Sequence, residues 1–484
     1  MTTQTEAFYK AVLARDYRFD GKFYVGVKTT GIYCRPICPA KPKRENVEFF
    51  ASALLAEKAG YRACLRCRPD CAPGSPAWGG KNTTIDLALK LLSQNAHEGL
   101  SEETFAGRLG MGARHLRRLF KEELGKTPKE IYDDNRLNFA RTLVRDTFLS
   151  MTDIAFAAGF GSLRRFNDAM RQRFRCAPSH LRRKTPSAIQ TGGGIQLSLA
   201  YRPPLDWAHL LAYYERHRLM GVERIEKGVY ERVFKLGKTI GAVRVFPHAT
   251  KPELVLNIAL PEPKYLFKTV QMVRRMFDLD SDPLLVANAF SGSKKFSALV
   301  KKYPGLRLPR GWDAFEALIC TVLGQLVSVE HARRLIQQLI LGYGESITHP
   351  LTGQPAFLFP RPEALANASL KKVKTTDARK KTIREAARRV LAGELSLAST
   401  QEPAAFRTAL RSIKGIGPWS AESISLRALG DTDAFPHTDL ILQRALTLYS
   451  TEEVKALRPW RGYAAIYLWK EFAAMFAKQK TEVV

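Results

Sequence analysis

The N-terminal part of the chain combines two kinds of hydrophobic periodicity. Apolar segments at 23–27 and 47–50 follow the alternation of short, half-buried strands. A short helical pattern comes next, at 51–59. Together these elements predict a small α+β unit.

Farther along, the periodicity becomes helical and then mixed. Apolar residues such as Leu116 and Phe120 recur at helical spacing. Strand-like segments return later, the clearest at 253–260, and the pattern is strongly helical after Trp312. The chain therefore contains all-helical and mixed parts.

Two stretches rich in Gly, Pro and Ser, at 72–80 and 184–194, have the composition of linkers. We therefore expect a multidomain protein, mainly α with α+β parts. The expected domains are a small α+β domain at 1–75, an all-α domain at 81–184, a small α+β subdomain at 195–300 and an all-α domain at 301–484.

Length and charge narrow the function classes. The chain has 484 residues, too many for one small fold, and its 76 Lys and Arg against 46 Asp and Glu give a formal charge of +30. Because 45% of the residues are hydrophobic, packed cores are expected. A cationic excess spread along the chain favours DNA or RNA as the partner, since neutralising phosphates releases counterions.

The sequence contains no uncharged apolar stretch of about 18 residues, and its first residues lack the apolar core of a signal peptide. We therefore expect a cytoplasmic protein with no membrane partner. In a reducing compartment the seven cysteines are not expected to form a disulfide framework.

Five of the cysteines lie between residues 34 and 71. Cys34 with Cys38, and Cys64 with Cys67, form two closely spaced pairs, which is the arrangement of a tetrahedral zinc site. Cys71 lies beyond the pairs and is expected to be a spare thiol. Composition alone favours a purely structural zinc, and a reactive zinc thiolate is the alternative.

The residues around these cysteines support the reactive alternative. Segments 29–38, 44–50 and 59–70 resemble the N-terminal domain of the bacterial adaptive-response regulator to DNA methylation damage, over nearly all of residues 1–75. The resemblance implies that Cys34 is a zinc ligand that also takes a methyl group irreversibly from a methylphosphotriester in DNA. It implies that the other zinc ligands are Cys38, Cys64 and Cys67.

Methylation would turn one thiolate into a neutral thioether and remove one negative charge from the site. We expect this change to weaken repulsion from the DNA backbone and so to raise DNA affinity. The regulator normally ends in a second methyl acceptor within a Pro-Cys-His-Arg motif. Cys176 and Cys320 lie in other contexts, so direct repair of O-alkylated bases is not expected.

Two helix-turn-helix patterns follow, at 100–125 and 151–174. In each, an Arg-rich second helix follows a tight turn, so that two helices would enter successive major grooves of DNA. The two patterns together resemble the AraC-type double helix-turn-helix, and a helical linker domain with solvated charges is the alternative. The candidate DNA-contacting residues are Arg114, Arg117, Arg118, Arg164 and Arg165.

A third candidate region lies near the C-terminus. A Gly-Ile-Gly turn at Gly415 and Gly417 separates two helical patterns between 410 and 430. Such a turn lets backbone N–H groups approach a phosphate with no side chain in the way. Asp439 follows at an expected helix start, where capping is its plainest role.

With 312–329 and 458–469, these segments resemble DNA-3-methyladenine glycosylase II of the helix-hairpin-helix superfamily. The resemblance covers about 195–475 and implies a small antiparallel sheet with helices in 195–300. The roles implied are a catalytic carboxylate for Asp439, walls of the base pocket for Trp419 and Trp469, a wedge for Leu326 and DNA binding for Gly415 and Gly417. If Trp469 is considered without the other segments, packing in the hydrophobic core is the simpler role.

Each of these roles has a chemical reason. Breaking an N-glycosidic bond builds positive charge on the sugar, which a carboxylate stabilises while it orients water. The base must leave the helical stack before it can be reached. An N-alkylated purine is cationic, so an aromatic face attracts it more than it attracts normal adenine.

Two residues refine this expectation. Bifunctional members of the superfamily have a lysine just after the hairpin glycines, where this chain has Trp419, so a monofunctional enzyme without strand cleavage is expected. The family pocket often has a tyrosine four residues later, where this chain has Ser423. One pocket wall, and with it the range of accepted bases, is left open by this departure.

The expected protein joins a zinc-thiolate methylphosphotriester sensor, a DNA-binding transcriptional regulator and a glycosylase for alkylated purines. A methylation-responsive activator whose glycosylase half only binds DNA is the alternative. The expected partner is double-stranded DNA, both damaged and promoter DNA, with RNA polymerase as a further candidate.

Overall fold

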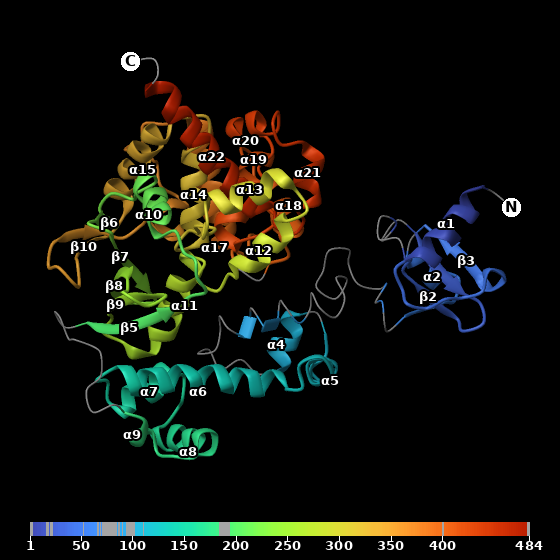
Figure 1. Ribbon diagram of the computed structural model, residues 1–484, viewed down its shortest axis with the longest axis horizontal. Helices are drawn as coiled ribbons and strands as arrows, with labels where there is room; N and C mark the ends of the chain where they lie inside the picture. The colour runs from blue at the N-terminus through green and yellow to red at the C-terminus, as the bar shows by residue number, and fades with distance from the viewer. Residues whose placement is uncertain are drawn as a thin grey trace. The chain divides into compact units, whose positions relative to one another are not determined.

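The computed structural model describes residues 3–15, 19, 23–51, 53–64, 67, 69, 85, 88–89, 91–92, 102–109, 111–182, 194–398 and 401–481 (Figure 1). Contacts divide the chain into two compact units, which are Met1–Asn95 with Gly99–Asp133, and Ala96–Glu98 with Asp134–Val484. The division into four domains stays a prediction. Its boundary between residues 300 and 301 falls inside helix α13 (Lys294–Lys302).

A four-stranded sheet in the order β3-β1-β2-β4 organises the N-terminal part of the first unit. Strand β1 pairs antiparallel with β2 and β3, and β2 pairs parallel with β4. Because side chains alternate, Phe23 and Val25 pack with α1 whereas Tyr24 packs with α2. The elements are α1 (Thr3–Ala14), β1 (Tyr24–Val27), β2 (Ile32–Cys34), η2 (Arg44–Asn46), β3 (Val47–Phe50), α2 (Ala53–Lys58) and β4 (Arg62–Ala63).

From residue 85 onwards, the described residues of the first unit are mainly helical. Phe105, Leu116 and Phe120 are buried in one core between the helices. The second helix ends at Gly125, whose φ of 69° suits a glycine in the left-handed C-cap position. The expected turn residue Gly110 lies outside the described residues. The helices are α4 (Glu102–Arg108), α5 (Ala113–Leu124) and the start of α6 (Pro128–Asp146).

The second unit begins with the rest of α6 and a second helix pair. Ser150 and Ser162 cap α7 and α8, because their hydroxyl oxygens accept from the N–H groups of Asp153 and Arg165. Buried apolar residues of these helices form one continuous core with the following sheet. Phe139 and Phe267, on α6 and α11, meet edge to face at 4.9 Å between ring centroids. The helices are α7 (Met151–Ala157), α8 (Leu163–Phe174) and α9 (Pro178–Leu181).

The antiparallel sheet expected within 195–300 is confirmed, with five strands in the order β5-β9-β8-β7-β6. Figure 1 shows α11 alongside this sheet. The elements are β5 (Ile195–Ala200), α10 (Trp207–Arg216), β6 (Glu223–Glu226), β7 (Val229–Leu236), β8 (Thr239–Pro247), β9 (Glu253–Ala259), η3 (Pro263–Tyr265), α11 (Leu266–Met276) and α12 (Pro283–Phe290).

The C-terminal part is helical, as expected, around α14, which is buried along most of its length. Helices α12 and α13 pack with the C-terminal helices in a second core. A small hairpin of two strands, β10 (Ser346–Thr348) and β11 (Pro355–Phe357), was not predicted. The other elements are α14 (Ala314–Leu323), α15 (Val329–Tyr343), α16 (Pro362–Leu365), α17 (Asp377–Leu391), α18 (Pro403–Arg411), α19 (Pro418–Ile424), the π-helical η4 (Ser425–Leu429), α20 (Leu440–Ala445), α21 (Thr451–Ala456) and α22 (Arg461–Thr481).

The fold class is confirmed as multidomain and mainly α with α+β parts. Within the described ranges, every helix is too short or too polar to span a bilayer.

Candidate functional site

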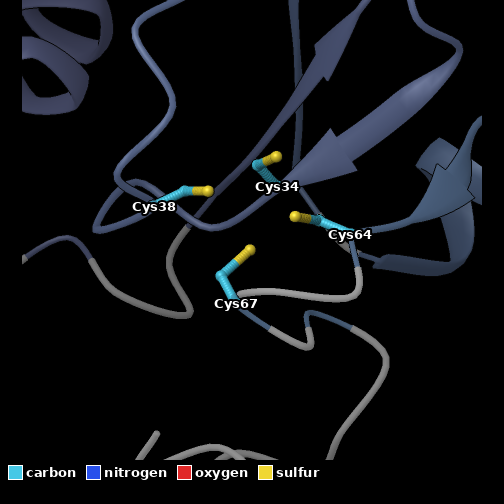
Figure 2. A group of neighbouring side chains, drawn as sticks. All are labelled: Cys34, Cys38, Cys64 and Cys67. Atoms are coloured by element: carbon cyan, nitrogen blue, oxygen red, sulfur yellow. The ribbon is translucent and has the colours of Figure 1, made fainter. Parts of the chain in front are cut away.

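Four cysteine side chains converge at the ends of two neighbouring strands, and Figure 2 shows them pointing toward one centre. Cys34 is the last residue of β2, and Cys64 directly follows β4, so the pairing of the strands brings both together. Cys38 and Cys67 lie in the turns that follow. All four are buried, and their sulfur atoms lie within 4.8 Å of one another. The predicted ligand set is therefore assembled in the fold.

Arg35 connects the two cysteine turns. Its backbone N–H donates to the sulfur of Cys67 at 3.3 Å, and its guanidinium Nη1 donates to the Cys67 carbonyl oxygen at 3.1 Å. The side chain is 3% exposed, so these bonds are shielded from water. The turn after Cys34 and the turn at Cys67 therefore hold each other in place.

The protonation of the cluster fits a divalent cation. Hydrogen bonds with Cys38 and Cys67, followed by burial, raise the pKa of the Cys34 thiol. Hydrogen bonds with Cys34 and Cys67 lower the pKa of Cys38 to about 2. Thiols packed this closely thus resist ionising together unless a cation compensates their charge. Thiolates at this spacing are the ligands that zinc takes, and the predicted zinc site is confirmed.

The candidate DNA-contacting arginines differ in whether a neighbouring carboxylate binds them. Arg117 is bound to Glu102 through two bonds, at 3.0 and 2.6 Å, and Arg118 lies 3.8 Å from Glu122. Arg164 and Arg165 are exposed in the first turn of α8. The second helix pair therefore presents its arginines more openly to a phosphate or a base. Arg114 is also exposed, on α5.

Asp439 is the N-cap of α20, so its capping role is confirmed. Its Oδ1 accepts from the backbone N–H groups of Ile441 and Leu442, at 3.1 and 3.2 Å. The indole Nε1 of Trp469 also donates to Oδ1, and the indole Nε1 of Trp419 donates to Oδ2, both at 3.1 Å. The carboxylate that the resemblance implied therefore lies directly between the two implied tryptophans. Because the resemblance implied a base pocket here, "base pocket" denotes the group of Asp439, Trp419 and Trp469.

The two carboxylate oxygens of Asp439 are not equivalent. Oδ1 accepts three hydrogen bonds, whereas Oδ2 accepts one. A carboxylate oxygen has about two lone-pair positions, so Oδ2 retains capacity for a further partner. The residue is partly exposed, which leaves that oxygen within reach of a ligand.

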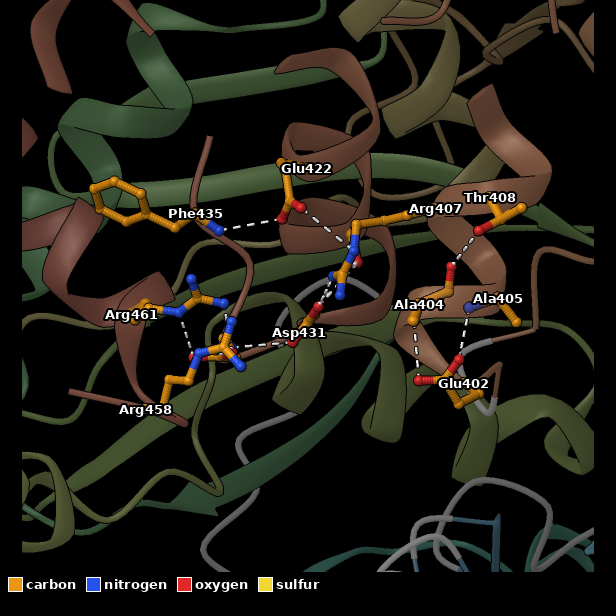
Figure 3. A network of polar contacts seen from close by, with 12 residues as sticks. Glu402, Ala404, Ala405, Arg407, Thr408, Glu422, Asp431, Phe435, Arg458 and Arg461 are labelled. Atoms are coloured by element: carbon orange, nitrogen blue, oxygen red, sulfur yellow. Dashed lines mark hydrogen bonds and ion pairs between the residues drawn. The ribbon is translucent and has the colours of Figure 1, made fainter. Parts of the chain in front are cut away.

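A network of ion pairs holds the loop that leads to Asp439 (Figure 3). Arg407 of α18 pairs with Asp431 and also lies 3.3 Å from Glu422. Glu422, on the same helix as Trp419, accepts the backbone N–H of Phe435 at 3.2 Å. Arg461 of α22 binds Asp433 through two bonds, at 2.8 and 2.6 Å. Three helices therefore fix the path of the chain before the carboxylate.

Leu326 protrudes from the loop between α14 and α15. Its side chain is fully exposed, and its φ of 52° is a conformation that leucine rarely adopts. The neighbouring Gln325 donates through Nε2 to the Gly415 carbonyl oxygen and to the Ser420 hydroxyl oxygen, both at 2.8 Å. Arg379 donates to the Gln325 carbonyl oxygen. The loop is thus held against the glycine hairpin with an apolar side chain directed into solvent.

The two hairpin glycines differ in backbone conformation and in the space available for a side chain. Gly415 has a φ of 96°, and a Cβ there would lie 2.3 Å from the hydroxyl oxygen of Thr382. That hydroxyl donates to the Lys414 carbonyl oxygen at 2.8 Å, so it cannot move freely. Gly417 is exposed, and a Cβ there would meet nothing within 4 Å. Packing within the protein therefore explains Gly415, whereas the residues that the structure describes leave room for a Cβ at Gly417.

Local sequence patterns did not indicate two side chains near the base pocket, which are those of Arg427 and Tyr213. The guanidinium of Arg427 lies over the ring of Trp469, with Tyr213 of α10 on the same guanidinium. Ser423, partly buried in α19, contributes no ring at the position where the family often has a tyrosine. Tyr213 is more than two hundred residues away in sequence, and no local pattern places it there.

Three family models match this chain. The metal binding domain of Ada matches residues 7–70, a helix-turn-helix domain matches 105–184, and the AlkA N-terminal domain matches 196–313. The matches follow the order of the expected domains and include all four cysteines of the metal centre.

Similar proteins cover either the whole chain or its parts. A probable bifunctional transcriptional activator/DNA repair enzyme AlkA of Mycobacterium tuberculosis is 34% identical over 96% of both chains. DNA-3-methyladenine glycosylase 2 of Escherichia coli is 28% identical over 56% of this chain and 96% of its own length. The bifunctional transcriptional activator/DNA repair enzyme Ada of Escherichia coli is 44% identical over 25% of this chain and 33% of its own length.

A solved structure shares the fold of the C-terminal part. The 3-methyladenine DNA-glycosylase from Archaeoglobus fulgidus has a TM-score of 0.50 and 20% identity, over 57% of this chain and 98% of its own. The fold expected from the glycosylase resemblance is therefore confirmed.

Proposed function

The chain belongs to the family of bifunctional transcriptional activators and DNA repair enzymes of the AlkA type, and we propose that it is a monofunctional DNA glycosylase acting on alkylated purines such as 3-methyladenine. The observation that carries the proposal is the placement of Asp439, whose carboxylate accepts both indole N–H groups of the base pocket. A capping aspartate has no need of two tryptophan donors, whereas a carboxylate facing a sugar needs fixed orientation.

In this proposal the flipped base enters the pocket walled by Trp419 and Trp469, and Leu326 fills the gap that the base leaves in the duplex. Oδ2 of Asp439, with one donor, faces the sugar, while the three donors on Oδ1 keep the carboxylate from rotating. As the bond between C1′ and the base nitrogen breaks, its electron pair leaves with the base. The carboxylate stabilises the positive charge on the sugar, orients the water that adds to C1′ and accepts the proton that this water releases.

The residue after the hairpin supports the monofunctional form of this chemistry. Trp419 stands where a Schiff-base mechanism would need an amine nucleophile, and an indole nitrogen cannot supply one. Gly417 and the exposed backbone around it are available to a DNA phosphate.

We propose a second activity for the N-terminal domain, which is uptake of a methyl group from a methylphosphotriester in DNA. The four cysteines would hold zinc, which supplies charge compensation that keeps the sulfurs ionised at neutral pH. The Cys34 sulfur forms a bond to the methyl carbon, the bond between that carbon and the phosphate oxygen breaks, and the oxygen leaves as a phosphodiester anion. The methyl thioether then stays on the protein.

The helix-turn-helix domain completes the proposal as a sequence-specific DNA binder. Its exposed arginines Arg164 and Arg165 would contact promoter DNA, and methylated Cys34 would raise the affinity by removing one negative charge. A domain that activates transcription also needs a surface for RNA polymerase, which we propose as a further partner.

The glycosylase proposal is tested with methylated duplex DNA. We expect the purified full-length protein to release 3-methyladenine, measured by chromatography, and Asp439→Asn to release it about 10²- to 10³-fold more slowly. The variant keeps a capping side chain, so its fold is expected to survive. Equal release by both proteins would refute the catalytic role of Asp439, and no release by either would favour an activator whose glycosylase half only binds DNA.

The methyl-uptake proposal has its own readout. After incubation with a duplex containing a methylphosphotriester, mass spectrometry is expected to find one added methyl group in the peptide containing Cys34. Cys176, a partly exposed cysteine far from the cluster in sequence, provides the internal control and is expected to stay unmodified. Methylation at any other cysteine of the cluster would refute the assignment to Cys34.

A further inference from the structure

Arg427 lies between two aromatic rings at the base pocket. Its guanidinium carbon is 4.5 Å from the ring centroid of Tyr213 and 5.6 Å from that of Trp469. Tyr213 comes from α10 and Trp469 from α22, so helices distant in sequence meet on this one side chain. Both separations are within the range of a cation–π contact.

The charge of Arg427 is not neutralised by a neighbouring carboxylate in the part of the chain that the structure describes. Its Nη1 donates to the Pro309 carbonyl oxygen at 2.7 Å, and no salt bridge accompanies that bond. Arg407 and Arg461 nearby are both paired with aspartates. Arg427 therefore keeps its full positive charge against the indole of Trp469.

A second titratable group near this pair contributes no charge at neutral pH. Burial, followed by the positive charge of Lys470, lowers the pKa of His209 to about 4. The ammonium of Lys470 itself lies over another ring, that of Tyr303, at 5.8 Å. Of these groups, Arg427 is the cation held over the Trp469 ring.

We propose that Arg427 is a specificity-determining residue that reduces the pocket's preference for cationic bases over neutral bases of the same shape. This inference rests on the proposed glycosylase function, because it takes Trp469 as a wall of the base pocket. A cationic purine stacked on Trp469 uses the attraction between a cation and a ring face. Arg427 already uses that attraction and adds repulsion between two like charges.

Ser423 strengthens the effect of this charge. It lies in α19, four residues before Arg427 of the π-helical η4, and its short side chain supplies no further ring to stabilise a cation. Selection among bases would then depend on shape and on leaving-group quality more than on charge.

The test compares two duplexes that differ only in the charge of one base. Both carry a 2′-fluoro sugar, which resists glycosidic cleavage because fluorine destabilises the positive charge on the sugar. One holds cationic 7-methylguanine, and the other holds 7-methyl-7-deazaguanine, a neutral base of the same shape. We expect Arg427→Gln to raise the ratio of their affinities, cationic over neutral, by on the order of tenfold. Arg427→Lys, which keeps the charge, is expected to stay near the wild-type ratio.

Lys470→Gln is the matched control, since it removes a charge next to Trp469 in sequence that is not held over its ring. Its ratio is expected to equal that of the wild type. An unchanged ratio in Arg427→Gln, or equal ratios in Arg427→Gln and Arg427→Lys, would overturn the proposal. Because binding is measured without cleavage, absence of base release would refute the glycosylase proposal while the affinity ratio still decides the role of Arg427.

Discussion

The metal centre and the base pocket are assembled over very different distances along the chain. The four sulfur ligands lie between residues 34 and 67, in two short turns that follow paired strands. The side chains of the base pocket come from the starts of two helices and the middle of a third, between residues 419 and 469, with Leu326 added from an earlier loop. A reactive centre built from adjacent turns depends on its metal, whereas one built from distant helices depends on the core beneath it.

The chemistry proposed for the two centres differs in the same way. A thioether on Cys34 cannot release its methyl group by the reverse reaction under ordinary conditions, so that centre would act once. Asp439 is not consumed by hydrolysis and would act repeatedly. Changes made at one centre and measured at the other show whether the two centres are independent.

Removal of zinc is expected to affect only the metal centre. Structural zinc contributes an apparent free energy on the order of 10 kcal/mol to small domains, which is far more than the hydrogen bonds of Arg35 contribute between the two cysteine turns. In the full-length protein treated with a chelator, amide hydrogen exchange in β1 and β3 is expected to become fast. Exchange in α14, buried in another core, provides the comparison and is expected to stay slow. Slow exchange in the strands without metal would show that the apolar packing around Phe23 is sufficient.

Inactivation of each centre tests their independence. Cys34→Ser is expected to abolish methyl uptake and leave base release within about twofold of the wild type, since the centres belong to different compact units. Asp439→Asn is expected to show the converse, with base release reduced about 10²- to 10³-fold and methyl uptake unchanged. Loss of both activities in either variant would show that the two centres are coupled.

The hairpin glycines give a matched pair within the glycosylase site. Gly415→Ala is expected to lower the free energy of unfolding by about 2 kcal/mol, because φ is positive and Thr382 blocks the new methyl group. Gly417→Ala has open space and a negative φ, so its stability is expected to change by less than about 0.5 kcal/mol.

Their DNA affinities distinguish packing from recognition. We expect Gly417→Ala to weaken binding to abasic duplex about threefold or more, because its methyl group stands where a phosphate would approach. Thermal unfolding and a binding titration on both variants are sufficient. Unweakened binding by Gly417→Ala would remove the hairpin from the DNA interface.

Substitution of Leu326 is expected to change stability the least. Stability is expected to rise slightly in one variant, whereas activity is expected to fall. Leu326→Gly relieves the positive φ and is expected to raise the free energy of unfolding by about 0.5 kcal/mol, while base release falls about tenfold. Leu326→Ala keeps the strained backbone, so it should lose similar activity with no gain in stability. Full activity in both variants would leave the exposed leucine without a role as a wedge.

The sequence was most informative where spacing alone determines geometry. The cysteine pairs and the cap at Asp439 follow from local patterns, and the antiparallel sheet within 195–300 followed from the family resemblance. Asp439 also shows that two interpretations of one residue are compatible, since the same carboxylate caps α20 and accepts both indoles.

Features that depend on distant packing were not predictable from any window of the chain. The contact of Tyr213 with Arg427 requires the sheet subdomain and the C-terminal helices to be assembled first. The ion pair of Arg117 with Glu102 was likewise not predictable from a local pattern, because Glu102 lies on a neighbouring helix, and the DNA contact of Arg117 stays a prediction. The β10–β11 hairpin is too short for its alternation to stand out within a helical region.

The core that the second helix-turn-helix shares with the five-stranded sheet has a consequence for the history of this protein. Two ancestral genes joined end to end can separate again as long as each product folds alone. Once Phe139 and Phe267 pack against each other, a break at residues 184–194 would expose apolar surface on both products. Selection would then act against fission, and the regulator and the glycosylase would be inherited as one gene.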